Sequence, residues 1–325
     1  MHRFTVLTIV VAVALSAIAA AQRRDAFVES RDHAAIAYSS VVPRDAVAAL
    51  NGQVQNDAVQ LRFDPVNGYL RSALDALHVP VESQTLVFSQ TSFQAQLINI
   101  HNPRALYFND AVAVGWVRGG KFLEVAVQDP RQGVVFYALE QKDTVRPQFK
   151  RTEECLACHL SWDTLGVPGF FMMSMYPLPD DKNAYANGFT SDHRSPFSER
   201  WGGWYVTGNA GGATHMGNVP VMPVDQGKSI LADPLRPLPS LDGLFDSTGY
   251  LSPYSDVVAL MVLAHQTRMT NLITRVGWEE RVESQNPQPG RSRACEGRCR
   301  GSGRLHVVCR RSASGGGHSR LLRVC

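Results

Sequence analysis

The chain has 325 residues, of which 44% are hydrophobic, so it is long enough to bury one large or two modest cores. Its formal net charge of +3 is unevenly distributed: residues 289–325 contribute +8 and Arg3 contributes +1, which leaves −6 on the remainder. An acidic body of this kind gives no support to nucleic-acid binding.

Residues 1–21 have the pattern of a secretory signal peptide. Arg3 supplies the basic start, an apolar run follows, and Ala19-Ala20-Ala21 offers the small residues that signal peptidase cleaves after. An uncleaved membrane anchor is the alternative, but the run is short for a span. Because no later run is long and apolar enough, we expect a periplasmic or secreted bacterial protein without a stable membrane span after cleavage.

Residues 22–150 form a mixed N-terminal region that includes a β-meander. Apolar residues between Asn67 and Pro80 recur at helical spacing, which predicts a short helix that the proline ends. From residue 85 to 141 the period changes to two, with turn sequences at Gly119-Gly120 and around Pro130. This pattern predicts an antiparallel meander over about 105–141.

The motif Cys155-Leu156-Ala157-Cys158-His159 is typical of covalent c-type haem attachment, in which two thiols bind the porphyrin and the histidine binds its iron. Thr152 is a candidate cap for a short helix that begins here. Three other sites use similar residues: a redox dithiol, which needs a free thiolate, a zinc site, which needs further ligands, and a disulfide. We favour one covalent haem c, with the export signal as supporting context.

Two segments after the motif carry a resemblance to known proteins. Pro168 stands nine residues after His159, which resembles small bacterial cytochromes c, and this implies that its carbonyl accepts the ring N–H of His159. A simple Pro-Gly turn is the alternative. The glycine- and tryptophan-rich segment 192–218 indicates a structured loop. Together with residues 105–117 and the motif, it resembles a largely uncharacterised bacterial family of exported mono-haem c-type cytochromes, over about 85–275.

Several residues are candidates for further contacts with a haem. Arg194 and Arg200 match the carboxylate geometry of haem propionates, although an ordinary ion pair is the alternative. Side chains able to bind iron as a sixth ligand follow, and we rank them in this order: His215, Met222, His265 and Met216. His215 ranks first because of its place in the glycine-rich loop. Met222 ranks second because a proline follows it, a pair that resembles the Met-Pro of small cytochromes c.

The C-terminal part divides into a helix and an anomalous tail. Ser252-Pro253 can begin a helix to about Arg275, and the face predicted to lie toward the core contains Val258, Met261, His265, Met269, Leu272 and Val276. Residues 287–325 are rich in Arg, Gly, Ser and Cys and have no hydrophobic period, which predicts disorder or an out-of-frame translation. A Cys-rich metal or disulfide module is the other interpretation of this tail.

The sequence therefore predicts an α+β protein in which a helical c-type haem region, residues 151–286, packs with an antiparallel β-meander domain. The predicted function is electron transfer by an exported c-type cytochrome, with a redox partner protein or a small-molecule electron donor or acceptor. The alternatives are a peroxidase-like or small-molecule oxidoreductase with an open iron site, and a haem-based sensor. Iron coordination distinguishes them, because a carrier has both axial positions filled.

Overall fold

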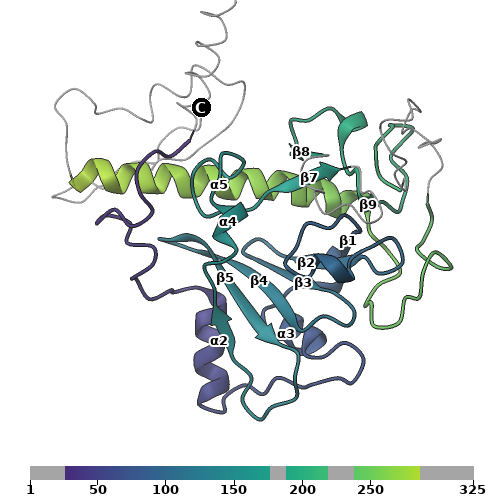
Figure 1. Cartoon of the computed structure of the whole chain (residues 1–325), viewed down its shortest axis with the longest axis horizontal. Helices are drawn as coiled ribbons and strands as arrows, with labels where there is room; N and C mark the ends of the chain where they lie inside the picture. The colour runs from purple at the N-terminus through teal and green to yellow at the C-terminus, as the bar shows by residue number, and fades with distance from the viewer. Residues whose placement is uncertain (1–25, 176–187, 219–237, 286–325) are drawn as a thin grey trace, which may run out of the picture.

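The computed structural model describes residues 26–175, 188–218 and 238–285, and its main feature is a seven-stranded antiparallel sheet (Figure 1). The strand order is β6-β5-β4-β3-β2-β1-β9. The bounds are β1 Thr85–Val87, β2 Arg104–Phe108, β3 Val112–Trp116, β4 Phe122–Asp129, β5 Gly133–Glu140, β6 Phe149–Arg151 and β9 Trp204–Tyr205. A separate pair consists of β7 (Met172–Met175) and β8 (Gly188–Ser191).

The helices are few, and most of them are short. They are α2 (Ala46–Gln55), α3 (Leu70–Ala76), α4 (Leu156–His159) and α5 (Val257–Gln285), with short 3-10 turns at Val81–Ser83, Ala95–Leu97 and Phe197–Glu199. The predicted helix after Asn67 is confirmed as α3. The predicted signal peptide at 1–21, Met222 and the tail at 287–325 lie outside the described residues.

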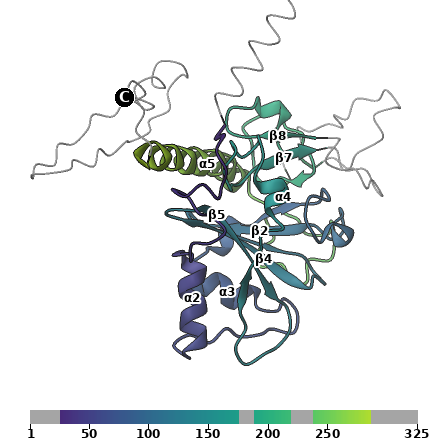
Figure 2. The same cartoon turned by 60° about the vertical axis from the view of Figure 1, so that its left-hand side comes forward.

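The predicted meander is confirmed, because β2, β3, β4 and β5 pair in sequence as antiparallel neighbours. Along β4 every second residue is buried, so the strand presents one fully buried face and one half-buried face. The buried face packs against α2 and α3, and α4, α5 and the β7-β8 pair lie on the other side of the sheet (Figure 2). The half-buried face therefore looks toward the cysteine motif.

The predicted fold class is wrong. The protein is mostly an antiparallel sheet, and the described residues 151–175 and 188–218 contain only the four-residue α4 and short 3-10 and strand segments where a helical haem region was expected. The physical reason is composition, since the many Gly, Pro and small polar residues after the motif favour turns over helix. The predicted cap is also wrong: Cys155 precedes the first helical residue, and Thr152 Oγ1 instead accepts the N–H of Glu154.

The long helix α5 is present, but it buries a different face from the one that was predicted. The first half of the predicted core face is exposed, with Val258 60% and Met261 43% exposed and His265 on the surface, whereas its second half, Met269, Leu272 and Val276, is half-buried. The buried face instead includes Asn271, Thr274 and other polar residues. These two polar side chains are satisfied there, because Asn271 is hydrogen-bonded to Phe170 in the loop after the motif and Thr274 to Gln128 in the sheet.

Candidate functional site

The cysteine motif lies on α4, between the half-buried face of the sheet and α5 (Figures 1 and 2). Residues three and four apart on a helical turn share a face, so Cys155, Cys158 and His159 project from the same side. The His159 N–H donates to the carbonyl of Cys155 at 2.9 Å, which closes the turn. Both thiols are free, with Cys155 half-buried and Cys158 exposed.

The imidazole of His159 is held by the loop that follows the motif. Its Nδ1 donates to the carbonyl oxygen of Gly169 at 2.8 Å, and the Gly169 N–H donates back to the carbonyl of His159 at 3.0 Å. A neutral histidine whose Nδ1 donates has its lone pair on Nε2. Within the described part of the chain Nε2 makes no hydrogen bond, so it is the nitrogen available to a metal.

The resemblance to small cytochromes c implied that Pro168 would supply this carbonyl, and the structure places it one residue later. The Pro168 carbonyl instead accepts the N–H of Val134, the second residue of β5, at 3.1 Å. The bond predicted for Pro168 is therefore wrong, and the ring N–H of His159 donates to Gly169 instead. The nine-residue offset from His159 identified the correct loop but not the residue whose carbonyl accepts the bond. Two consecutive carbonyls in a turn that contains Pro and Gly point in different directions.

Aromatic packing keeps His159 neutral. The rings of Phe136 and Phe171 both lie 4.9 Å from the imidazole, centroid to centroid. Burial lowers the pKa of His159 to about 4, against the opposing effect of the bond to Gly169. The side chain is therefore uncharged at neutral pH, which is the form that binds a metal ion.

The environment of Cys155 argues against a redox dithiol. Burial raises the pKa of its thiol to about 11, and the nearby carboxylate of Glu124 adds to the rise. A reactive dithiol needs a lowered pKa, because the thiolate is the nucleophile. A zinc site also finds no support, since no group of three or more His, Cys, Asp or Glu side chains in the described residues is arranged to hold a metal ion.

One charged pair beside the motif was missed by the sequence analysis. Arg104 on β2 forms an ion pair with Glu124 on β4, and both side chains are less than one-fifth exposed. The second carboxylate oxygen of Glu124 accepts the hydroxyl of Ser92 at 2.6 Å, whereas Nε of Arg104 is buried without an acceptor. Both charges act on the pKa values of Cys155 and His159.

Small side chains lie on the sheet near these residues, packed against the apolar core. Ala113 and Ala126 are half-buried and directly opposite each other on β3 and β4, and Gly115 is the neighbour of Glu124. A methyl group added at Gly115 would lie 2.5 Å from the Arg104 guanidinium, so the glycine makes space for it. The buried Nε–H of Arg104, which has no acceptor among the described residues, is a donor of the kind that binds a carboxylate, the group that a haem propionate presents.

The two arginines predicted for haem propionates are hydrogen-bonded within their own segment. Arg194 pairs with Asp192 at 2.7 Å, and Arg200 donates to the backbone carbonyls of His193 and Ser195. None of these hydrogen bonds involves the motif, so a role of either arginine toward a haem stays a prediction.

The described candidates for a sixth ligand also have other contacts. His215 is buried against Trp201, and its Nδ1 accepts the N–H of Gly217 at 3.1 Å. The sulfur of Met216 lies 3.8 Å from the hydroxyl of Ser174. His265 is exposed, and its ring lies 4.7 Å from that of His193, centroid to centroid, at an interplanar angle of 58°. Since none of these contacts includes His159, a sixth ligand at the motif stays a prediction.

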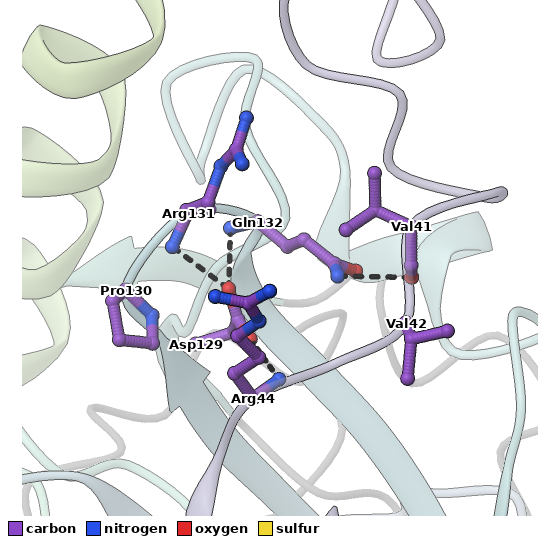
Figure 3. Close-up of a pocket in the computed structure, with 7 residues that line it drawn as sticks. All are labelled: Val41, Val42, Arg44, Asp129, Pro130, Arg131 and Gln132. Carbon is purple, nitrogen blue, oxygen red and sulfur yellow. Dashed lines mark hydrogen bonds between the residues drawn. The ribbon is translucent and has the colours of Figure 1, made fainter.

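A hollow of about 370 Å³ is lined by Val41, Val42, Arg44 and the turn from Asp129 to Gln132 (Figure 3). The carboxylate of Asp129 accepts the backbone N–H groups of Arg44, Arg131 and Gln132 at 2.7–2.8 Å. A buried carboxylate with three such bonds stabilises the turn between β4 and β5. We therefore assign this hollow no chemistry.

No model of a protein family, no curated protein and no solved structure matches the chain. Among the described helices none has the length and apolar character needed to cross a membrane.

Proposed function

We propose that the protein is an exported c-type cytochrome that binds one haem covalently through Cys155 and Cys158, with His159 as the axial ligand, and transfers electrons. The observation that carries this proposal is the bond from Nδ1 of His159 to the Gly169 carbonyl, because it directs the lone pair of Nε2 away from the loop. When bound, haem iron supplies a one-electron ferric–ferrous couple.

The chain's own residues have separate tasks in this proposal. The two thiols fix the ring against α4, and Gly169 orients His159 through its carbonyl. Phe136 and Phe171 exclude water from one side of the imidazole. Arg104 is the side chain that we propose for a propionate, in place of Arg194 and Arg200, because its buried Nε lacks an acceptor.

The experiment is expression of the full chain in a bacterium with a c-type haem maturation system, followed by acid extraction and a pyridine haemochrome spectrum. We expect the haem to remain on the protein and to give a c-type spectrum. Cys158→Ala should keep at most one thioether bond, and His159→Ala should lose the axial bond. His101→Ala, which changes an exposed histidine, is the control and should match the wild type. Complete loss of haem from the wild type on extraction would refute the proposal.

A second candidate function is a haem oxidoreductase or sensor with an open iron position. It is favoured by the contacts of His215, Met216 and His265, each of which is engaged away from His159. Carbon monoxide and imidazole binding separate the two functions. A six-coordinate low-spin spectrum that neither ligand changes supports a carrier, and a high-spin spectrum that both change supports the open site.

A further inference from the structure

Asn271 is a polar residue on the buried face of α5, and only 1% of it is exposed. Its Oδ1 accepts the N–H of Phe170 at 2.9 Å, and its Nδ2 donates to the carbonyl of the same residue at 2.6 Å. One side-chain amide therefore satisfies both backbone groups of Phe170, as a neighbouring strand would. Two bonds from a buried side chain fix the position of this backbone closely.

The residue that Asn271 holds is adjacent to the one that holds His159. Gly169 exchanges two hydrogen bonds with His159, and Pro168 accepts the N–H of Val134. Three consecutive loop residues are thus attached to three elements: β5, α4 and α5. The carbonyl of Gly169 has little freedom to move unless one of these attachments is lost.

The packing of Gly169 against Asn271 is also close. A methyl group added at Gly169 would lie 2.1 Å from Oδ1 of Asn271, far inside van der Waals contact. The loop backbone therefore lies directly against the amide. This arrangement needs glycine at 169 and a short planar amide at 271.

We propose that Asn271 is a positioning residue for His159: its amide holds the Gly169 carbonyl at the place that sets the orientation and donor strength of the imidazole. The inference rests on the proposed function, because orientation matters most when Nε2 binds iron. A firm Nδ1–H to carbonyl bond raises the basicity of the ligand nitrogen and favours ferric iron. Loss of the amide weakens that bond and raises the reduction potential.

The test uses Asn271→Leu, which has a similar size and no hydrogen bonds, and Asn271→Ala, which leaves room for water to bond to Phe170. Thr267→Val is the matched control, because Thr267 is buried on α5 one turn earlier and its hydroxyl donates within the helix, to Ala264. In purified holoprotein we expect both Asn271 variants to keep covalent haem and to shift the ferric–ferrous equilibrium about tenfold toward ferrous, which is about 59 mV for a one-electron couple. Thr267→Val should not shift it.

A second measurement does not need haem. In the full chain without haem, the ¹⁵N chemical shifts of the His159 ring report which nitrogen carries the proton. We expect the Nδ1–H form in the wild type and in Thr267→Val, and a mixture of both forms in the Asn271 variants. Variants that lower the melting temperature but change neither the potential nor the ring shifts would give Asn271 a merely structural role and overturn the inference. If the wild type binds no covalent haem, the proposed function fails while the ring shifts still decide the inference.

Discussion

His159 and His215 are neutral histidines with opposite proton positions. Nδ1 of His159 donates to a carbonyl, whereas Nδ1 of His215 accepts an N–H, so a neutral His215 carries its proton on Nε2. Iron binding through Nε2 of His215 would require the bond to Gly217 to break. The sequence analysis ranked His215 first because of its loop context, which contains no information about these proton positions.

His215→Asn tests this distinction, because the asparagine Oδ1 can replace Nδ1 as the acceptor for Gly217. We expect the visible and near-infrared spectra of the holoprotein to stay unchanged. The near-infrared band of methionine ligation should be recorded in the same samples and in Met222→Ala. A change of spin state in His215→Asn would show that His215 binds the iron after all.

The opposite charges of Arg104 and Glu124 should have opposite effects on the reduction potential of a bound haem. Removal of a positive charge near the iron favours ferric iron, and removal of a negative charge favours ferrous iron. We expect Arg104→Gln to lower the reduction potential and Glu124→Gln to raise it. Each variant should change the free energy of reduction by on the order of 1 kcal/mol. Arg118→Gln, in a pair with the exposed Asp246, is the control and should have a much smaller effect. Shifts of the same sign in both site variants would contradict the assignment.

Two loop glycines, Gly166 and Gly119, have left-handed backbones but differ in how closely other atoms surround them. Gly166, in the loop that carries the Gly169 carbonyl, has φ +73°, and an added methyl group would lie 2.3 Å from the carbonyl oxygen of Phe27. Gly119, in the turn between β3 and β4, has φ +76° with nothing near an added methyl group. The two positions share backbone strain and differ only in crowding.

We expect Gly119→Ala to cost about 1 kcal/mol of unfolding free energy, from the left-handed backbone alone. Gly166→Ala should cost about 1–3 kcal/mol more, because the surrounding backbone must also shift. Urea unfolding of both variants, followed by circular dichroism, measures the difference. Equal losses would mean that the loop after the motif is not packed against Phe27 as described.

The strands and helices differed in how well the sequence predicted them. The meander was predictable because Leu123, Val125 and Val127 alternate with half-buried residues, and the burial along β4 follows that alternation. The orientation of α5 was not, because apolar residues lie on more than one side of the helix, and the buried side also contains polar residues such as Asn271 and Thr274 that are hydrogen-bonded to Phe170 and Gln128. Hydrophobic periodicity finds such a helix, but it does not decide which apolar side is buried.

At the scale of the whole molecule, the fold joins segments that are distant in the chain around one histidine. Arg104 and Glu124 come from the meander, Gly169 from the loop after the motif, and Asn271 from the last described helix. The sequence predicted the local members of this group, the cysteines and His159, from their spacing. It did not predict Arg104 or Asn271, because their proximity depends on strand register and helix packing.

The central claim is that one haem is bound covalently at this site. The most direct measurement is the intact mass of the purified holoprotein, followed by mass spectrometry of the proteolytic peptide that contains residues 155–159. The account predicts a mass increase equal to one haem, located on the peptide with Cys155 and Cys158 and absent when both are replaced by alanine. An unmodified peptide from protein that was made with an active haem maturation system would contradict it.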